Sequence, residues 1–196
     1  MLNRKSNNTK LIMETWRRFM NEGTDITKQM TDLGHEAWRK GFVKNNGEEA
    51  TRFKPVPGSE SLEDLKSKGF EGLKVIDGVV NQNINQPASK IIPALNDKLN
   101  GAPAVGYNKA MNEVEINSVE DIKTLADKFH KVWMECNSWQ KDNSPEMFVP
   151  YSKLSRDLKI KDLEQVELAI KIMYGDDSEE YKFWGQAMNE QINYNR

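Results

Sequence analysis

The strongest constraint on the fold is a stripe of apolar side chains in the second half of the chain. The stripe consists of Ile122, Leu125, Ala126, Phe129, Val132 and Trp133. Intervals of three and four residues place these side chains on one face of an α-helix. Asn117 or Ser118 is placed to cap its start, and Asn137 with Ser138 ends it. A helix with one apolar face is stable mainly through packing, so we expect a layered helical protein.

The remaining segments predict a mainly α fold with a short antiparallel β element. The other expected helices span about residues 10–21, 25–42, 62–68, 93–99, 161–174 and 178–192. Asp77-Gly78 predicts a tight hairpin turn between two short strands. A strand-like extended segment is expected at Phe148–Tyr151, because Pro150 disfavours helix at Val149 before it. We expect a leader with an amphipathic helix over residues 1–23, a domain over 24–175 with a loop-rich elaboration at 59–115, and an amphipathic helix over 176–196.

The composition excludes several functional classes. A net charge of −2 provides no positive field to hold a nucleic acid or an anionic membrane. No segment approaches the roughly 18 consecutive apolar residues of a membrane span. The single cysteine, Cys136, excludes an internal disulfide and a thiolate-rich zinc site. We therefore expect a protein of the cytoplasm with no bound cofactor.

Both histidines of the chain occur in the same local pattern. His35 is followed by Trp38, and His130 is followed by Trp133. A spacing of three places each imidazole beside an indole on one helix face. Either the two helices make related contributions to one core or groove, or the match arises by chance.

No catalytic set is visible in the sequence. Cys136 lies six residues after His130, which does not bring a thiol against an imidazole on a helix. The chain contains no HExxH pattern for zinc, and its glycines do not match a phosphate-binding loop. We therefore expect a protein that is not an enzyme.

The aromatic residues around the turn at 137–147 favour a binding site. Trp133, Trp139 and Tyr151 would converge if the turn folds the following segment back over the helix. Aromatic faces beside Lys141 or Lys153 would suit a flat, anionic small molecule. The alternative is that Trp133 and Tyr151 fill the core.

A resemblance to the ryanodine-receptor repeat (RyR) domain rests on LADKFHKVWMECNSW, PEMFVPYSKLS and the helix that follows. The matched positions are Leu125, Ala126, His130, Trp133, Trp139, Pro145, Val149, Pro150, Tyr151, Leu154 and Ser155. Upstream, DLGHEAWRKGFVKNNGEE is similar to the segment that precedes the repeat in small phage and bacterial RyR proteins. Its matches are His35, Glu36, Ala37, Arg39 and Gly47. The resemblance covers about residues 26–58 and 116–175 and implies a helix–turn–strand–helix core.

The resemblance also implies a ligand, because paired repeats of the receptor form a clamp that stacks an adenine-type molecule. Carried over, Trp133 is the stacking plane, and His130, Trp139 and Tyr151 surround it. The chain departs from the family pattern at Asn137, where a basic residue is common. The turn QKDNS is also shorter than usual. Lys141 is then the nearby cation, and Arg39 beside His35 on the upstream helix is the expected second charge. The resemblance therefore implies eight ligand-binding residues: Trp133, His130, Trp139, Tyr151, Lys141, Asn137, His35 and Arg39.

The leader resembles the targeting segments of tailed-phage prohead proteins. Leu11-Ile12-Met13-Glu14 fits their type of cleavage site, with Glu14 as the processing residue. We therefore expect a phage or bacterial RyR-type protein that binds a nucleotide-derived small molecule in the host cytoplasm. The alternative is a protein packaged in the virion that docks on capsid proteins and has no small-molecule ligand.

Overall fold

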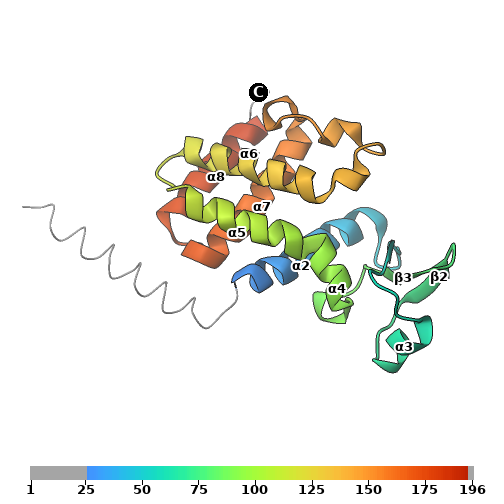
Figure 1. The fold of residues 1–196 in the computed structure, drawn as a ribbon. Coiled ribbons are helices and arrows are strands. Elements are labelled where there is room, and N and C mark those ends of the chain that lie inside the picture. The colour runs from blue at the N-terminus through green and yellow to red at the C-terminus, as the bar shows by residue number, and fades with distance from the viewer. Residues whose placement is uncertain (1–25, 194–196) are drawn as a thin grey trace, which may run out of the picture.

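The computed structural model describes residues 26–193, and Figure 1 shows a helical body from which a small sheet unit projects at one end. The expected leader helix and Glu14 lie outside the described residues. The principal helices are α2 (Ile26–Asn46), α5 (Ala102–Glu113), α6 (Val119–Cys136), α7 (Arg156–Tyr174) and α8 (Glu179–Asn193). The prediction of a mainly α protein with a short antiparallel β element is confirmed.

Helix α6 is the centre of the helical body and packs against α5, α7 and α8. Its predicted apolar stripe is buried from Ile122 to Phe129, with Ile122 and Leu125 fully enclosed, and is half-buried at Val132 and Trp133. Phe129 stacks on Tyr107 of α5 with ring centroids 4.2 Å apart. Ser118 caps the helix by accepting a hydrogen bond from the backbone N–H of Asp121. The helix therefore forms for the reason that its sequence pattern indicates.

Helices α5 and α6 approach closely because Gly106 has no side chain. A Cβ atom at Gly106 would lie 2.4 Å from Cγ1 of Val132. The β-branched Val132 therefore packs directly on the backbone of α5. This contact sets the spacing of the two helices beneath the cleft described below.

The sheet unit contains β1 (Phe53–Pro55), β2 (Leu73–Ile76) and β3 (Val79–Asn83), in the antiparallel order β1-β3-β2. The predicted hairpin is present, with Ile76 opposite Val79 and positive φ angles at Asp77 and Gly78. Helix α3 (Leu62–Ser67) covers the unit and starts with a capping box between Ser61 and Asp64. A separate small core holds the unit together: Val56, Leu65, Ile84, Ile91, Ile92 and Leu95.

The expectation that residues 59–115 form a loop-rich elaboration is wrong for their last part. A continuous helical run consists of α4 (Pro93–Asn96), the π-helical turn η2 (Asp97–Gly101) and α5. Gly101 does not end the helix, and its φ is −68°. Pro103, which lacks an N–H, follows the π turn, where the regular hydrogen-bond pattern is already altered. The run supplies buried side chains such as Ala104, Tyr107 and Met111 to the main core.

The strand expected at Phe148–Tyr151 is absent from the structure. The segment instead contains short 3₁₀ turns, η3 (Ser138–Gln140), η4 (Pro145–Met147) and η5 (Tyr151–Lys153). The carbonyl of Val149 accepts a hydrogen bond from His130 rather than from a strand partner, and Pro150 has no N–H to donate. Consequently the helix–turn–strand–helix core lacks its strand, and the antiparallel element lies at residues 53–83.

Among residues 26–193, every helix is too short or too polar to span a lipid bilayer.

Candidate functional site

His130 is held rigidly in the core between two other elements. Its Nε2 lies 2.9 Å from the carbonyl oxygen of Val149. A carbonyl only accepts hydrogen bonds, so Nε2 carries the hydrogen. Its Nδ1 lies 3.1 Å from Oδ2 of Asp162 on α7. The imidazole therefore connects α6 to both the η5 turn and α7.

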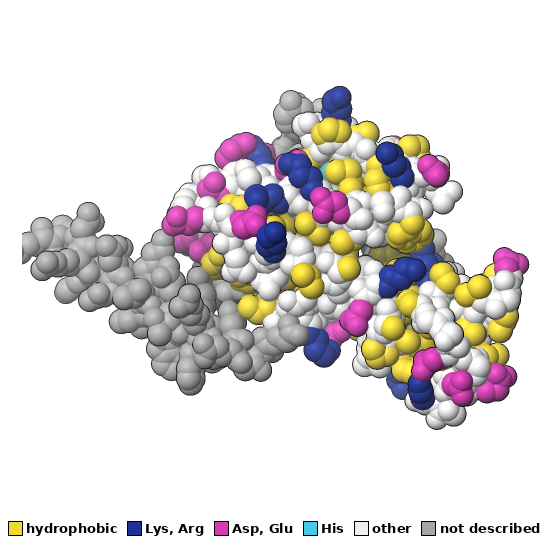
Figure 2. Space-filling model, in the orientation of Figure 1, with side chains coloured by type: hydrophobic (Ala, Val, Ile, Leu, Met, Phe, Trp, Pro, Cys, Tyr) yellow, Lys and Arg dark blue, Asp and Glu magenta, His cyan; other side chains and the backbone are white. Residues whose placement is uncertain are grey.

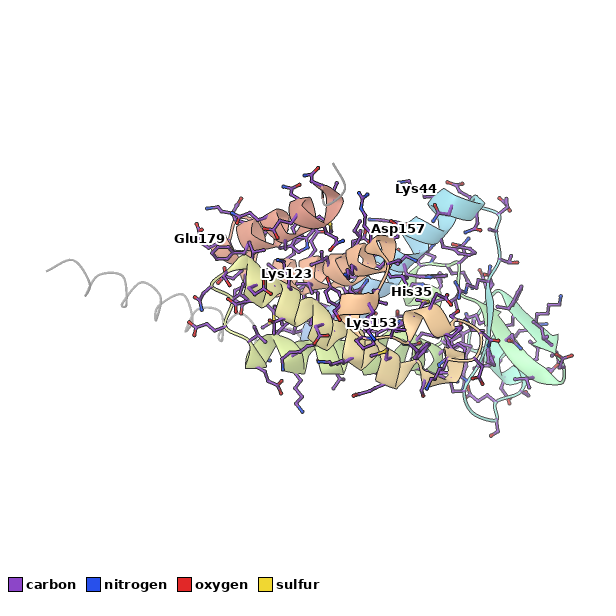
Figure 3. All side chains as sticks on the ribbon, turned by 90° about the horizontal axis from the view of Figure 1, so that it is seen from above. His35, Lys44, Lys123, Lys153, Asp157 and Glu179 are labelled. Atoms are coloured by element: carbon purple, nitrogen blue, oxygen red, sulfur yellow. The ribbon has the colours of Figure 1, made fainter. Side chains whose placement is uncertain are left out.

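His35 on α2 is held in the same way, and Figure 3 labels it at the centre of the molecule, between the helices and the sheet unit. Its Nε2 donates to the carbonyl of Gln86 at 2.9 Å. Its Nδ1 accepts from the side-chain amide of Asn100 at 3.4 Å. Both histidines are almost completely buried, at 1% exposure for His35 and 3% for His130.

The two carbonyls lie in turns of nearly identical conformation. Each precedes a proline, and Pro87 and Pro150 share a φ of −52° with ψ values of 145° and 143°. A 3₁₀ turn follows in both cases, η1 (Ala88–Lys90) after Pro87 and η5 after Pro150. The segments PASKI and PYSKL therefore adopt the same local conformation, and the carbonyl just before each segment accepts a hydrogen bond from a histidine.

The third elements also correspond. Asn100 comes nine residues after Ile91, and Asp162 comes eight residues after Leu154. The π turn at Asp97–Gly101 accounts for the difference, because a π turn inserts one residue into a helix. The shared contacts favour a repeated structural unit over a chance match. We call α2, η1 and the η2 turn the first half-unit, and α6, η5 and α7 the second half-unit.

The two half-units border one cleft with a volume of about 970 Å³. Trp38 and Trp133 both line it. The indole of Trp38 lies 5.7 Å from the ring of His35, and that of Trp133 lies 6.2 Å from His130 and nearly parallel to it. Trp133 also packs against Phe148, with the two ring centroids 5.3 Å apart. Each tryptophan is thus supported from behind by a fixed imidazole while it borders open space.

Asp162 is the acidic group of the cleft that lies deepest in the protein. Burial raises the pKa of its carboxyl to about 7, and Lys161 opposes this shift. Its Oδ2 is enclosed next to Nδ1 of His130, but the contact is not aligned as a hydrogen bond. The carboxyl therefore has unused hydrogen-bonding capacity beside the two aromatic half-units.

Two basic side chains from the sheet unit reach the same cleft. The guanidinium of Arg52 lies 5.6 Å from the ring centroid of Trp38. Nζ of Lys54 lies 4.7 Å from the ring centroid of Trp139 and so connects β1 to the turn after α6. Sequence reasoning missed Arg52, Lys54, Trp38 and Asp162 as site residues. For Trp38 the signal was present in its spacing from His35.

The structure places five of the eight residues predicted for the site around the cleft: His35, His130, Trp133, Asn137 and Trp139. Asn137 contributes mainly as a cap, because its amide donates to the carbonyl of Trp133 at 3.0 Å. The other three lie outside the lining. The guanidinium of Arg39 lies 3.7 Å from the carboxylate of Glu36. The side chain of Lys141 is exposed to solvent. Tyr151 packs behind His130, with the two ring centroids 6.4 Å apart.

The described residues show no arrangement for metal binding, since no group of three or more His, Cys, Asp or Glu side chains converges among residues 26–193. Burial and the neighbouring Glu135 raise the pKa of the Cys136 thiol, which disfavours the reactive thiolate. The arrangement can stack flat rings, exchange hydrogen bonds at Asp162 and attract negative charge.

No protein-family model, no curated protein and no solved structure matches this chain.

Proposed function

We propose that this chain is a non-catalytic, RyR-like binding protein that captures a nucleotide-derived small molecule in the cleft between its half-units. The single observation that supports this most is the pair of tryptophans, Trp38 and Trp133, each backed by a buried histidine and both facing one cleft. A nucleobase stacked on an indole contributes about 1–3 kcal/mol. Fixed rings lose little conformational entropy on binding, so such a cleft is well suited to a flat ligand.

The size and polarity of the cleft support the same class of ligand. A volume of about 970 Å³ is at the upper end of the range for small-molecule sites and accommodates a nucleotide or dinucleotide. Asp162 supplies a hydrogen-bonding group for the polar edge of a base, and Arg52 and Lys54 supply positive charge. A purely structural role gives no reason for these polar groups to border one cleft.

A thermal-shift screen with AMP, ADP, cyclic adenine nucleotides and ADP-ribose tests the proposal. A ligand at about 100 times its dissociation constant should stabilise the protein by about 2.7 kcal/mol. Trp133→Phe should keep part of the shift, and Trp133→Ala should lose it. Trp184→Phe is the matched control, because Trp184 on α8 donates to the carbonyl of Leu163 and does not line the cleft. No shift for any compound would refute the ligand and favour the virion-associated structural role.

A further inference from the structure

We propose that Arg52 and Lys54 form a phosphate subsite at the end of the cleft next to the sheet unit, and that the ligand carries at least two negative charges there. The assignment of this subsite to a nucleotide rests on the proposed function, whereas the anion subsite itself does not. The ligand class is then a nucleoside diphosphate or a related pyrophosphate, with its base stacked between the half-units.

The first support is the clustering of like charges. Arg52 and Lys54 both line the cleft. Burial lowers the pKa of the Lys54 ammonium, and the nearby positive charges of Arg52 and Lys98 lower it further. Figure 2 shows dark-blue side chains beside the junction between the helical body and the sheet unit. Cations brought together in this way repel one another unless an anion joins them.

The second support is the absence of counter-ions. Within residues 26–193, neither Arg52 nor Lys54 forms an ion pair with a carboxylate. Away from the cleft, lysines such as Lys123 and Lys128 have a carboxylate oxygen at 3.0 Å and 2.9 Å respectively. Arg52 and Lys54 therefore have no directly paired carboxylate, although Asp162, Glu164 and Glu167 line the same cleft.

The third support is how the cluster is held in place. Arg52 lies over the ring of Trp38, and Lys54 lies over the ring of Trp139. A cation–π contact stabilises a cation without neutralising it, so the donors remain available to a ligand. A guanidinium offers two parallel N–H donors to phosphate oxygens, and an ammonium adds a point charge. Because the same tryptophan, Trp38, borders the stacking cleft, the subsite is continuous with it.

Comparing ADP with adenosine, which differ only in their phosphates, tests the subsite by titration calorimetry at low salt. We expect the wild-type chain to bind ADP at least about tenfold more tightly than adenosine, as charged hydrogen bonds should provide. Lys54→Gln and Arg52→Gln should each remove most of this preference, measured as the ratio of the ADP and adenosine affinities of the same variant. Lys74→Gln is the matched control, because Lys74 lies on the same sheet but does not line the cleft.

Inorganic pyrophosphate separates failure of the subsite from failure of the proposed function. If neither ADP nor adenosine binds, a thermal shift with pyrophosphate that is lost in Lys54→Gln still supports the anion subsite. Equal affinities for ADP and adenosine, or Gln variants that behave like Lys74→Gln, would overturn it. Absence of both nucleotide binding and a pyrophosphate shift would overturn it as well.

Discussion

The carboxyl of Asp162 lies 3.1 Å from Nδ1 of His130, in the place where the first half-unit holds the neutral amide of Asn100 against His35. The two half-units therefore differ in one chemical respect. The first contains a polar pair that does not involve an acidic group, and the second contains a carboxyl whose protonation depends on pH.

Replacing Asp162 by Asn should reduce the pH dependence of stability. The folded-state pKa of Asp162 is about 7, above the unfolded value of 3.8. Between about pH 4 and pH 7 the folded state retains a proton that the unfolded state has lost, so the free energy of unfolding falls as pH rises. This carboxyl contributes a slope of at most about 1.4 kcal/mol per pH unit.

Asp162→Asn should therefore be more stable than the wild type at pH 8 and should lose that slope, as measured by denaturant unfolding across this range. Asp157→Asn alters an exposed carboxylate on the same helix and serves as the control. A wild-type and an Asp162→Asn curve that run parallel from pH 5 to pH 8 would contradict the assignment.

Removing either histidine should destabilise the fold by a similar amount. His35→Ala leaves the carbonyl of Gln86 without its donor, and His130→Ala does the same to Val149. Each substitution also leaves a cavity where the imidazole was. We expect each to lower the free energy of unfolding by about 2–4 kcal/mol. A cost below about 0.5 kcal/mol for only one of the two would show that the half-units are not equivalent.

Gly106→Ala should destabilise the protein by about 1–3 kcal/mol through overpacking, because the new methyl group would meet Val132 at 2.4 Å. Gly41→Ala is the control, since no atom lies within 4 Å of its Cβ position and helix propensity improves. Thermal unfolding measures both. The double variant with Val132→Ala should recover part of the loss, and a strictly additive double variant would argue against the contact.

Trp133→Ala should cost less stability than Phe129→Ala. Phe129 is fully buried and stacked on Tyr107, so its removal should cost about 3–5 kcal/mol. Trp133 is half-buried and borders the cleft, so we expect less than half of that cost. Equal costs by chemical denaturation would favour a core role for Trp133.

Much of the fold could be predicted from local signals. The stripe from Ile122 to Trp133, the Asp77-Gly78 turn and the Ser118 cap depend on residues close together in sequence. The helix through Gly101 and Pro103 was missed, because both residues normally interrupt helices and the π turn that accommodates them depends on its surroundings.

The candidate site was less predictable because its partners are distant in sequence. The spacing of His35 from Trp38 indicated the repeat, but their carbonyl and amide partners, Gln86 and Asn100, follow no local pattern. Arg52 and Lys54 occur in a segment rich in turn residues, and Asp162 resembles an ordinary solvated helix position. Only the packing of the sheet unit and the two half-units against one another brings these charges to one cleft.

In the sequence, the sheet unit is inserted between α2, which carries His35, and the turn η1 of the first half-unit. This insertion has a consequence for the order of folding. The His130–Val149 contact closes a loop of 19 residues, whereas His35–Gln86 closes one of 51. By loop-closure entropy, the longer closure costs about 0.9 kcal/mol more. We therefore expect the second half-unit to be the nucleus on which the first assembles, with higher φ-values for substitutions at His130 than at His35.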